Sequence, residues 1–363
     1  MAADISIPTT QKAALVHELG GPVNIIPDYP VLKPGKDEVL AQILYTGVCQ
    51  SDLHTARGTA PGADGKPILN VKLPHVGGHE GVGRIVSLGP SSASVPEVKV
   101  GDLVGIRFLA RVCHECEFCT SQREQHCVNA TNHLHHEDGS FQEYCVLDRN
   151  YLTPLSPDID PVVVGPVLCA GVTAYKAVKN AGLSPGQWLV VVGAGGGLGH
   201  FAIQYGKVVG ANVIGIDTGQ VKKDFVESLG GRFLDFAKSP NVVEEIKTIT
   251  NGGAHGAVVC SGSGRAFTGA VDMLRIGGTL SCIGIPPGDI HLTTPLATII
   301  IRGLKVVGNL VGSMEETLEA VELVRQGKVK PHIEVREFDE LPHIYEMLEK
   351  GDVLGRVVLK VAT

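Results

Sequence analysis

The hydrophobic positions in the first part of the chain come in short runs that glycine and proline interrupt. Four such runs have the length of strands: residues 13–17, 38–46, 83–88 and 102–106. Short apolar runs bounded by turn residues are typical of all-β domains. We therefore predict a partly open, β-barrel-like domain here. The stretch 58–73, rich in Gly, Pro, Ala and Asp, is expected to be an exposed loop.

From about residue 185 the pattern changes to strands that alternate with helices. Residues 187–192 form a continuous apolar run, as expected of a strand buried on both faces of a parallel sheet. Residues 198–209 then show helical periodicity, and the next strand, 212–216, ends at Asp217. Further segments of the same kind follow at residues 222–229, 233–234, 242–248, 256–260, 266–274 and 279–283. This alternation predicts an α/β, doubly wound nucleotide-binding fold.

Near residue 308 the alternation stops. We expect a helix at 314–327, a strand at 333–338, a helix at 341–349 and a strand at 356–360, all returning to the first domain. A length of 363 residues is too great for one ordinary core. The predicted domains are therefore 1–170 with 309–363, and 171–308.

Composition narrows the class of protein. The formal charge of −7 contains no basic block, so nucleic acid and anionic membranes are not expected as partners. The first twelve residues include Asp4 and lack an apolar core, and no apolar run is long enough to span a membrane. We expect a cytoplasmic enzyme. Its nine cysteines then indicate metal or catalytic thiolates before disulfides.

Four cysteines spaced C-x2-C-x2-C-x7-C give the strongest single signal: Cys113, Cys116, Cys119 and Cys127. Four thiolates this close can enclose one tetrahedral Zn²⁺ with no open position, which is the form of a structural site. The alternatives are an iron–sulfur cluster, a C-x2-C redox pair or ordinary thiols. Ferredoxin clusters continue with C-x3-C-P rather than x7-C, so structural zinc is favoured.

A second group of potential ligands lies in the segments G-V-C-Q-S-D-L-H and G-G-H-E-G-V-G. Cys49 and His79 provide a thiolate and an imidazole, a mixture that Zn²⁺ favours. Beside them are carboxylates that could orient an imidazole or tune the metal, and groups suited to moving a proton: Asp52, Glu80, Ser51 and His54. Two ligands do not complete a tetrahedral site, so a catalytic metal needs a third from elsewhere.

The segment G-A-G-G-G-L-G at 193–199 joins a predicted strand to a predicted helix. Its spacing is one residue off a strict G-x-G-x-x-G. In this context, however, its backbone can approach a pyrophosphate that lies on the helix N-terminus. The candidate contacts are Gly193, Gly195, Gly196, Gly197, Leu198 and Gly199.

Asp217, eighteen residues after Gly199, stands where a carboxylate bonds the adenosine ribose hydroxyls and repels a 2′-phosphate. NAD is therefore expected rather than NADP. Lys222 could reach the same ribose, or could be an ordinary exposed lysine of a helix.

The other histidines and cysteines receive no functional role. His133, His135 and His136 could suggest a metal tract, but we expect a solvated loop there. Cys145, Cys260 and Cys282 lie in apolar runs and are expected to be small buried residues.

Together these motifs resemble the zinc-dependent medium-chain alcohol dehydrogenases, most closely their yeast-type, NAD-dependent branch. The resemblance covers essentially the whole chain, from K-A-A-L-V to L-G-R-V-V-L, and includes P-V-L-C-A-G-V-T-A-Y, G-G-L-G and G-I-D. It implies a chaperonin-10-like β catalytic domain, a Rossmann coenzyme domain and a homo-oligomer, tetrameric in this branch. It also implies NAD and two Zn²⁺ per chain, one catalytic and one structural.

The resemblance assigns roles residue by residue. Cys49, His79 and Cys169 would be the catalytic zinc ligands, although Cys169 taken alone would be an ordinary buried thiol. Glu80 would be the glutamate next to the metal and Asp52 the aspartate behind its ligands. Two further roles are a proton relay and a contact with the cofactor pyrophosphate, which would fall to Ser51 with His54 and to Arg356.

The implied reaction is the reversible oxidation of primary, and also secondary or aromatic, alcohols to aldehydes or ketones with NAD⁺. Three departures from the family pattern bear on it. Gln50 replaces the usual His or Arg near the pyrophosphate, which should weaken cofactor binding. The T-A-P-G segment at 59–62 lacks a Trp that narrows the pocket, and Phe108 replaces another, so longer or aromatic alcohols are expected to fit.

Two alternatives stay open at this point. The first is another zinc branch of the family, such as a polyol or cinnamyl-type dehydrogenase. The second is a redox-inactive dinucleotide- or zinc-binding protein on the same fold.

Overall fold

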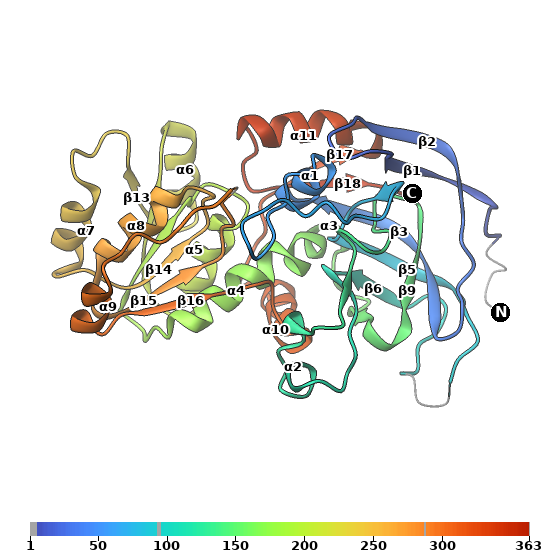
Figure 1. Cartoon of the computed structure of the whole chain (residues 1–363), viewed down its shortest axis with the longest axis horizontal. Coiled ribbons are helices and arrows are strands. Elements are labelled where there is room, and N and C mark those ends of the chain that lie inside the picture. Colours follow the sequence, from blue (N-terminus) through green and yellow to red (C-terminus); the bar gives the residue numbers. More distant parts are fainter. Residues whose placement is uncertain (1–5, 93–95, 287, 363) are drawn as a thin grey trace.

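The computed structural model describes residues 6–92, 96–286 and 288–362. Figure 1 shows two bodies side by side along the long axis, with α4 (Ala170–Ala181) between them. One body contains a six-stranded parallel sheet with helices on both faces. The other is built mainly from antiparallel strands.

The parallel sheet has the strand order β13-β12-β11-β14-β15-β16. Its strands are β11 (Trp188–Val192), β12 (Asn212–Asp217), β13 (Arg232–Asp235), β14 (Ala254–Val259), β15 (Leu274–Cys282) and β16 (Lys305–Gly308). In order along the chain this is 3-2-1-4-5-6, the doubly wound dinucleotide-binding arrangement. Its helices are α5 (Gly199–Val208), α6 (Gln220–Ser228), α7 (Val242–Thr250), α8 (Gly264–Met273) and α9 (Leu296–Arg302).

Alternating residues of β11 build the two cores of this sheet. Leu189 and Val191 pack with Phe201 of α5, whereas Val190 packs with Phe267 of α8. Because side chains of a strand point to opposite faces in turn, an unbroken apolar run supplies both cores at once. The sequence prediction of a strand buried on both faces is confirmed.

The other body contains a seven-stranded sheet in the order β10-β6-β5-β3-β18-β17, with β9 also paired to β3, and a three-stranded sheet β2-β1-β4. These strands, with β7 and β8 as a separate pair, are β1 (Thr10–Val16), β2 (Val23–Pro30), β3 (Glu38–Val48), β4 (His75–Val76), β5 (Gly81–Leu88), β6 (Leu103–Ile106), β7 (Leu109–Arg111), β8 (Thr131–Asn132), β9 (Tyr144–Asp148), β10 (Thr153–Pro154), β17 (Ile333–Glu337) and β18 (Arg356–Lys360).

Its α-helices are α1 (Gln50–Ala56), α2 (Glu117–Thr120), α3 (Pro161–Val164), α10 (Met314–Arg325) and α11 (Leu341–Lys350). Short 3-10 helices occupy Glu124–His126, Arg149–Tyr151, Gly165–Leu168 and Phe338–Glu340.

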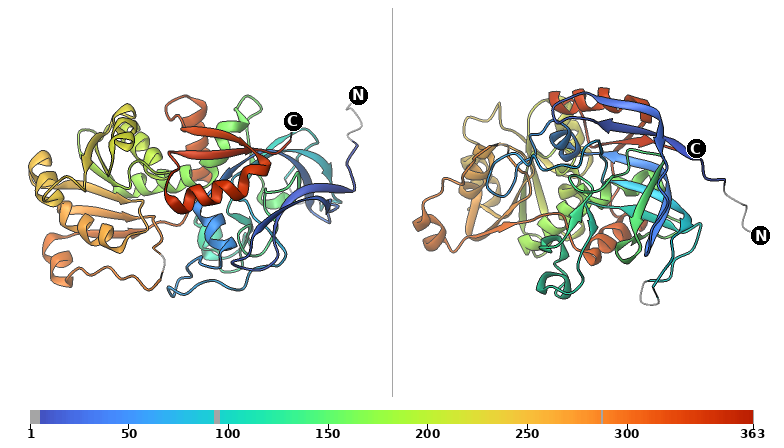
Figure 2. Two further views of the ribbon diagram at one scale, coloured as in Figure 1. Left: turned by 90° about the horizontal axis from the view of Figure 1, so that it is seen from above. Right: turned by 45° about the vertical axis from the view of Figure 1, so that its right-hand side comes forward.

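The C-terminal segment crosses back to the antiparallel body. β18 pairs antiparallel with β3, so that Val357 lies opposite Val48, and α11 packs over the first strands (Figure 2). This pairing brings Arg356 next to the turn that carries Cys49. The domain boundaries after residues 170 and 308 stay predictions.

Several elements lie outside the expected pattern, among them β2, β16, α4 and α9. β2 was not predicted, because its side chains are mostly half-buried or exposed and show no clean alternation. α9 was not predicted either, because none of its side chains is buried and its apolar residues therefore carry no amphipathic signal.

Among the residues that the structure describes, no single helix has the length and apolarity needed to cross a membrane. Two consecutive helices with a bend between them, 161–168 and 170–181, reach that length and apolarity when they are taken together.

Candidate active site

Three chain segments bring one cluster of metal-binding atoms together. Cys49 stands at the N-terminus of α1, His79 lies between β4 and β5, and Cys169 lies just before α4. Their ligand atoms and a carboxylate oxygen of Glu80 all lie within 4.8 Å of one another. His79 Nε2 is 3.1 Å from Cys169 Sγ. All four residues are buried.

The chemistry of this donor set fits a divalent zinc ion. Contact with Cys169 holds the pKa of the Cys49 thiol well below its usual value, while the pKa of Cys169 is raised by the same contact and by burial. Two sulfurs and an imidazole packed this closely in a buried site have the softness and spacing of zinc ligands. A bound cation would also offset the cost of burying thiolate charge.

Asp52 fixes the orientation of the imidazole. Its Oδ1 lies 2.8 Å from His79 Nδ1 and also accepts a hydrogen bond from Gly78 N, while its Oδ2 accepts from Cys49 N. Burial works to lower the pKa of His79, but the charge and hydrogen bond of Asp52 outweigh it and the pKa is raised. With Nδ1 engaged, Nε2 is left for a metal.

Glu80 forms a buried ion pair with Arg356, and its other oxygen, Oε2, has no hydrogen-bond partner among the described residues. Burial raises the pKa of Glu80 to about 7, against the opposing charge of Arg356. A Cβ on Gly47 would lie 2.0 Å from that free oxygen, so glycine is required there to leave room for the carboxylate. The position of Glu80 therefore depends on the absence of a side chain at Gly47 and on Arg356 of the C-terminal strand β18.

Ser51 and His54 lie on one face of α1, one turn apart. Ser51 Oγ is 3.8 Å from Cys49 Sγ, and the partly exposed His54 bonds Thr59 Oγ1 through Nδ1 at 3.0 Å. Burial lowers the pKa of His54. The sequence did not single out Thr59 as the partner of His54, since a single threonine in a loop carries no spacing signal. Gln50, at the start of α1, is exposed.

The glycine-rich turn after β11 has the shape of a dinucleotide cradle. Gly193 has φ +80°, and a Cβ on Gly199 would lie 2.2 Å from Gly193 O. A Cβ on Gly197 would lie 2.8 Å from Arg356 Nη1, so this guanidinium borders the turn as well as Glu80. Larger residues at these positions would clash, so the close packing of the turn requires glycine, as expected of a dinucleotide-binding turn.

Asp217 stands at the end of β12, beside this turn. Its carboxylate accepts hydrogen bonds from Gly195 N at 2.9 Å and from Lys222 Nζ at 3.0 Å. The expected pairing of strand end and glycine turn is therefore present. Lys222 lies against this site rather than as an isolated lysine in solvent, because its side chain also covers Gly195.

The segment 113–127, called the cysteine lobe below, carries the second cluster of potential ligands. The sulfurs of Cys113, Cys116, Cys119 and Cys127 all lie within 4.8 Å of one another. Cys113 Sγ is 3.9 Å from Cys119 Sγ and 3.6 Å from Cys127 Sγ, which fits one tetrahedral ion without an open position.

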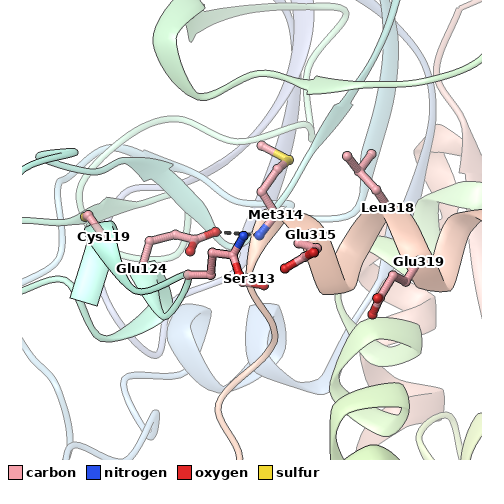
Figure 3. Close-up of a pocket in the computed structure, with 8 residues that line it drawn as sticks. Cys119, Glu124, Ser313, Met314, Glu315, Leu318 and Glu319 are labelled. Carbon is pink, nitrogen blue, oxygen red and sulfur yellow. Dashed lines mark hydrogen bonds between the residues drawn. The ribbon is translucent and has the colours of Figure 1, made fainter. Parts of the chain in front are cut away.

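A cavity of about 480 Å³ separates this lobe from the start of α10 (Figure 3). Glu124 crosses toward α10 and accepts a hydrogen bond from Met314 N. None of the residues that line the cavity belongs to the Cys49 cluster, and three of them are glutamates: Glu124, Glu315 and Glu319.

The expectation of a solvated histidine loop is wrong for two of its three members. His133 and His135 are buried, and only His136 is exposed. The loop folds back onto the core because His133 N bonds Phe108 O and His133 Nδ1 bonds Asp138 O. Tertiary contacts, invisible in the local sequence, override the polar composition.

Comparison with known proteins identifies the family. Residues 35–157 match the alcohol dehydrogenase GroES-like domain, and residues 197–326 match the zinc-binding dehydrogenase domain. A curated alcohol dehydrogenase of Schizosaccharomyces pombe is 39% identical over 360 residues, covering 99% of this chain and 100% of that protein.

Solved structures agree with this result. The alcohol dehydrogenase of the archaeon Aeropyrum pernix superposes with a TM-score of 0.84 at 33% identity, covering 96% of this chain and 99% of that one. A structure described as an NAD-dependent alcohol dehydrogenase gives a TM-score of 0.86 at 26% identity, covering 97% and 100%. With two domains matched in order and a relative similar over its whole length, this chain belongs to the zinc-binding alcohol dehydrogenase family.

Proposed function

We propose that this protein is a zinc-dependent alcohol dehydrogenase that reversibly oxidises primary alcohols, and also secondary or aromatic ones, with NAD⁺ as hydride acceptor. The observation that carries the proposal is the convergence of Cys49, His79 and Cys169 in a buried site that Arg356 connects to the glycine-rich turn. A site built only for stability would need neither the adjacent hydroxyl of Ser51 nor an approach to a dinucleotide.

Each residue has a separate task in this proposal. A zinc ion held by Cys49, His79 and Cys169 would act as a Lewis acid on the alcohol hydroxyl. Asp52 orients His79 so that Nε2 faces that ion. Glu80 would lie beside the ion, where its Oε2 could take the place of a water molecule or another ligand.

The proton would leave through α1. Ser51 Oγ, beside Cys49, would accept it and give up its own hydroxyl proton by way of a cofactor ribose hydroxyl to His54, which would deliver it to solvent. His54 suits this role because its lowered pKa keeps the imidazole neutral, and hence able to accept a proton, at neutral pH.

The nucleotide site would hold NAD, which supplies the hydride acceptor. Gly193, Gly195, Gly196, Gly197, Leu198 and Gly199 would form the pyrophosphate cradle, with Arg356 at its border. Asp217 would bond the adenosine ribose and disfavour a 2′-phosphate, with Lys222 beside it. A similar NAD-dependent structure supports this cofactor.

The pocket should accept alcohols larger than ethanol. The ring of Phe108 lies edge-on to His79 with ring centroids 6.5 Å apart, and Ala60 is a small buried side chain in the neighbouring loop. A phenyl ring and a methyl group fill less space than indoles at the same positions would.

The test is NADH formation with NAD⁺ or NADP⁺ over a series from ethanol to hexanol and from benzyl to cinnamyl alcohol, with and without a zinc chelator. We expect chelator-sensitive reduction of NAD⁺ that rises with chain length, and two zinc ions per chain by elemental analysis. Activity confined to ethanol would contradict the proposal that the pocket accepts larger alcohols. No turnover of any alcohol by zinc-loaded protein would contradict the proposed function.

The same proposal includes a homo-oligomer, a tetramer by resemblance to the yeast-type branch, and a cytoplasmic location. β16 ends the parallel sheet, and its outer edge is unpaired within the described residues. Next to it Leu296, Ile300 and Ile301 of α9 are exposed. An open strand edge beside exposed apolar side chains favours pairing with a second copy.

A further inference from the structure

The turn that carries Asp217 is held by a second carboxylate, Asp235. The two aspartates end neighbouring parallel strands, β12 and β13, and are directly paired in register. Phe236 N also donates to Asp217 O at 3.1 Å, so the backbones are joined at this point. The Asp235 side chain is only 12% exposed, although it lies at the end of a sheet.

Within the described residues, the side-chain carboxylate of Asp235 accepts three hydrogen bonds, two of them from the turn. Thr218 Oγ1 donates to its Oδ1 at 2.9 Å, and Gly219 N donates to its Oδ2 at 3.3 Å. The third comes from Ala237 N, which lies 3.0 Å from Oδ1 and fixes the carboxylate to its own strand end. Gly219 has φ +92°, a conformation that glycine adopts freely and other residues rarely do, so this turn requires glycine at that position.

Thr218 connects the two carboxylates. Its backbone N donates to Asp217 Oδ1 at 2.9 Å, while its hydroxyl donates to Asp235. Gly195 N holds the other oxygen, Oδ2, at 2.9 Å, so Thr218 and Gly195 together set the direction of the Asp217 carboxylate. The position of Thr218 in turn depends on Asp235. Lys222 alone cannot replace this restraint, because it is a flexible side chain that approaches the same Asp217 oxygen from α6.

We propose that Asp235 is a positioning residue for cofactor choice: through Thr218 it holds Asp217 toward an unphosphorylated adenosine ribose. The inference rests on the proposed NAD site. Without Asp235 the 217–219 turn loosens, Asp217 can move away, and both the bonding of ribose hydroxyls and the exclusion of a 2′-phosphate weaken.

Binding measured without turnover tests this. Isothermal titration of the zinc-loaded protein with ADP-ribose and with 2′-phospho-ADP-ribose gives two dissociation constants and their ratio. We expect Asp235→Ala to weaken ADP-ribose binding about tenfold and to reduce the discrimination against the 2′-phosphate. Thr218→Val, which removes only the bridging hydroxyl, should shift the ratio in the same direction.

Two further variants separate positioning from general damage. Asp235→Asn keeps an oxygen for Thr218 and Ala237 and loses only the weaker bond from Gly219, so it should restore most of the wild-type ratio. Asp272→Ala, an exposed aspartate on α8, should leave both constants unchanged. Thermal melts of each variant identify any that fails to fold, in which case Thr218→Val decides.

The outcomes are distinct. Wild-type ratios in both Asp235→Ala and Thr218→Val would overturn the inference and leave the proposed function intact. A change of ratio in Asp235→Asn as large as in Asp235→Ala would assign the effect to charge and overturn the positioning role. Failure of the wild-type protein to bind ADP-ribose would refute the proposed NAD site itself.

Discussion

Asp52 Oδ1 lies 2.8 Å from His79 Nδ1, and neither side chain reaches solvent. The same carboxylate accepts from the backbone of Cys49, so one aspartate orients two potential zinc ligands that stand thirty residues apart. Outer carboxylates of this kind set the tautomer and direction of a ligating imidazole.

Asp52→Asn should therefore weaken zinc binding at the Cys49 site by about 10–100-fold, the usual effect of losing such a partner. The change removes the charge and one of the acceptor oxygens. Competition with a chromophoric chelator measures it. Asp272→Asn, which alters an exposed aspartate on α8 in the other body, is the matched control and should keep wild-type zinc affinity.

Cys169→Ala should abolish turnover and leave one zinc ion per chain. Cys169 is one of only three proposed protein ligands, and the other sulfur, Cys49, cannot hold a catalytic ion with His79 alone. Cys145→Ala, equally buried and outside both clusters, should keep activity and both ions. Near-normal turnover in Cys169→Ala would remove this residue from the ligand set.

His54→Gln should slow alcohol oxidation mainly below about pH 8, by roughly tenfold near neutrality, because relay through a partly exposed base is only partly replaced by water. The lowered pKa of His54 makes the imidazole a neutral acceptor across this range. The pH dependence of kcat/KM for wild type and variant provides the measurement. Parallel profiles would mean that His54 carries no proton.

The buried His75 should make stability depend on pH. His75 is 2% exposed, neither ring nitrogen has a hydrogen-bond partner in the part of the chain that the structure describes, and burial lowers its pKa to about 4. Below about pH 6.5 the unfolded chain binds a proton that the folded one does not, so stability falls from there down to about pH 4.

The slope from this residue is at most about 1.36 kcal/mol per pH unit. His75→Leu should flatten the curve of unfolding free energy against pH by that amount in this range, as urea titrations can show. His343→Leu, an exposed residue of α11, should leave the curve unchanged. An unaltered slope in His75→Leu would contradict the assignment.

Ile301→Asp should dissociate the oligomer. Ile301 is 81% exposed on α9 beside the open edge of β16, and a carboxylate there would be desolvated in any contact between copies. Light scattering after size-exclusion chromatography gives the mass. Leu32→Asp, exposed in the other body, should keep the wild-type mass, and an unchanged mass in Ile301→Asp would place the interface elsewhere.

The local features of this protein followed from its sequence alone. The central strands of the parallel sheet were predictable because they are buried on both faces and alternate with amphipathic helices, a pattern visible within a dozen residues. The edge strand β16, which is mostly exposed, was not predicted. The lobe cysteines were predictable for a related reason: a metal site whose four ligands lie within fifteen residues is visible as spacing.

What the tertiary structure decided are the contacts between distant segments. Cys169 looks like any buried thiol until the fold brings it 3.1 Å from His79, ninety residues away. Arg356 meets Glu80 only because β18 pairs with β3, and Asp235 meets Thr218 only because two parallel strands end in register. The burial of His133 and His135 has the same origin. The spacing of residues along the chain does not predict these contacts, because they depend on how whole helices and strands pack.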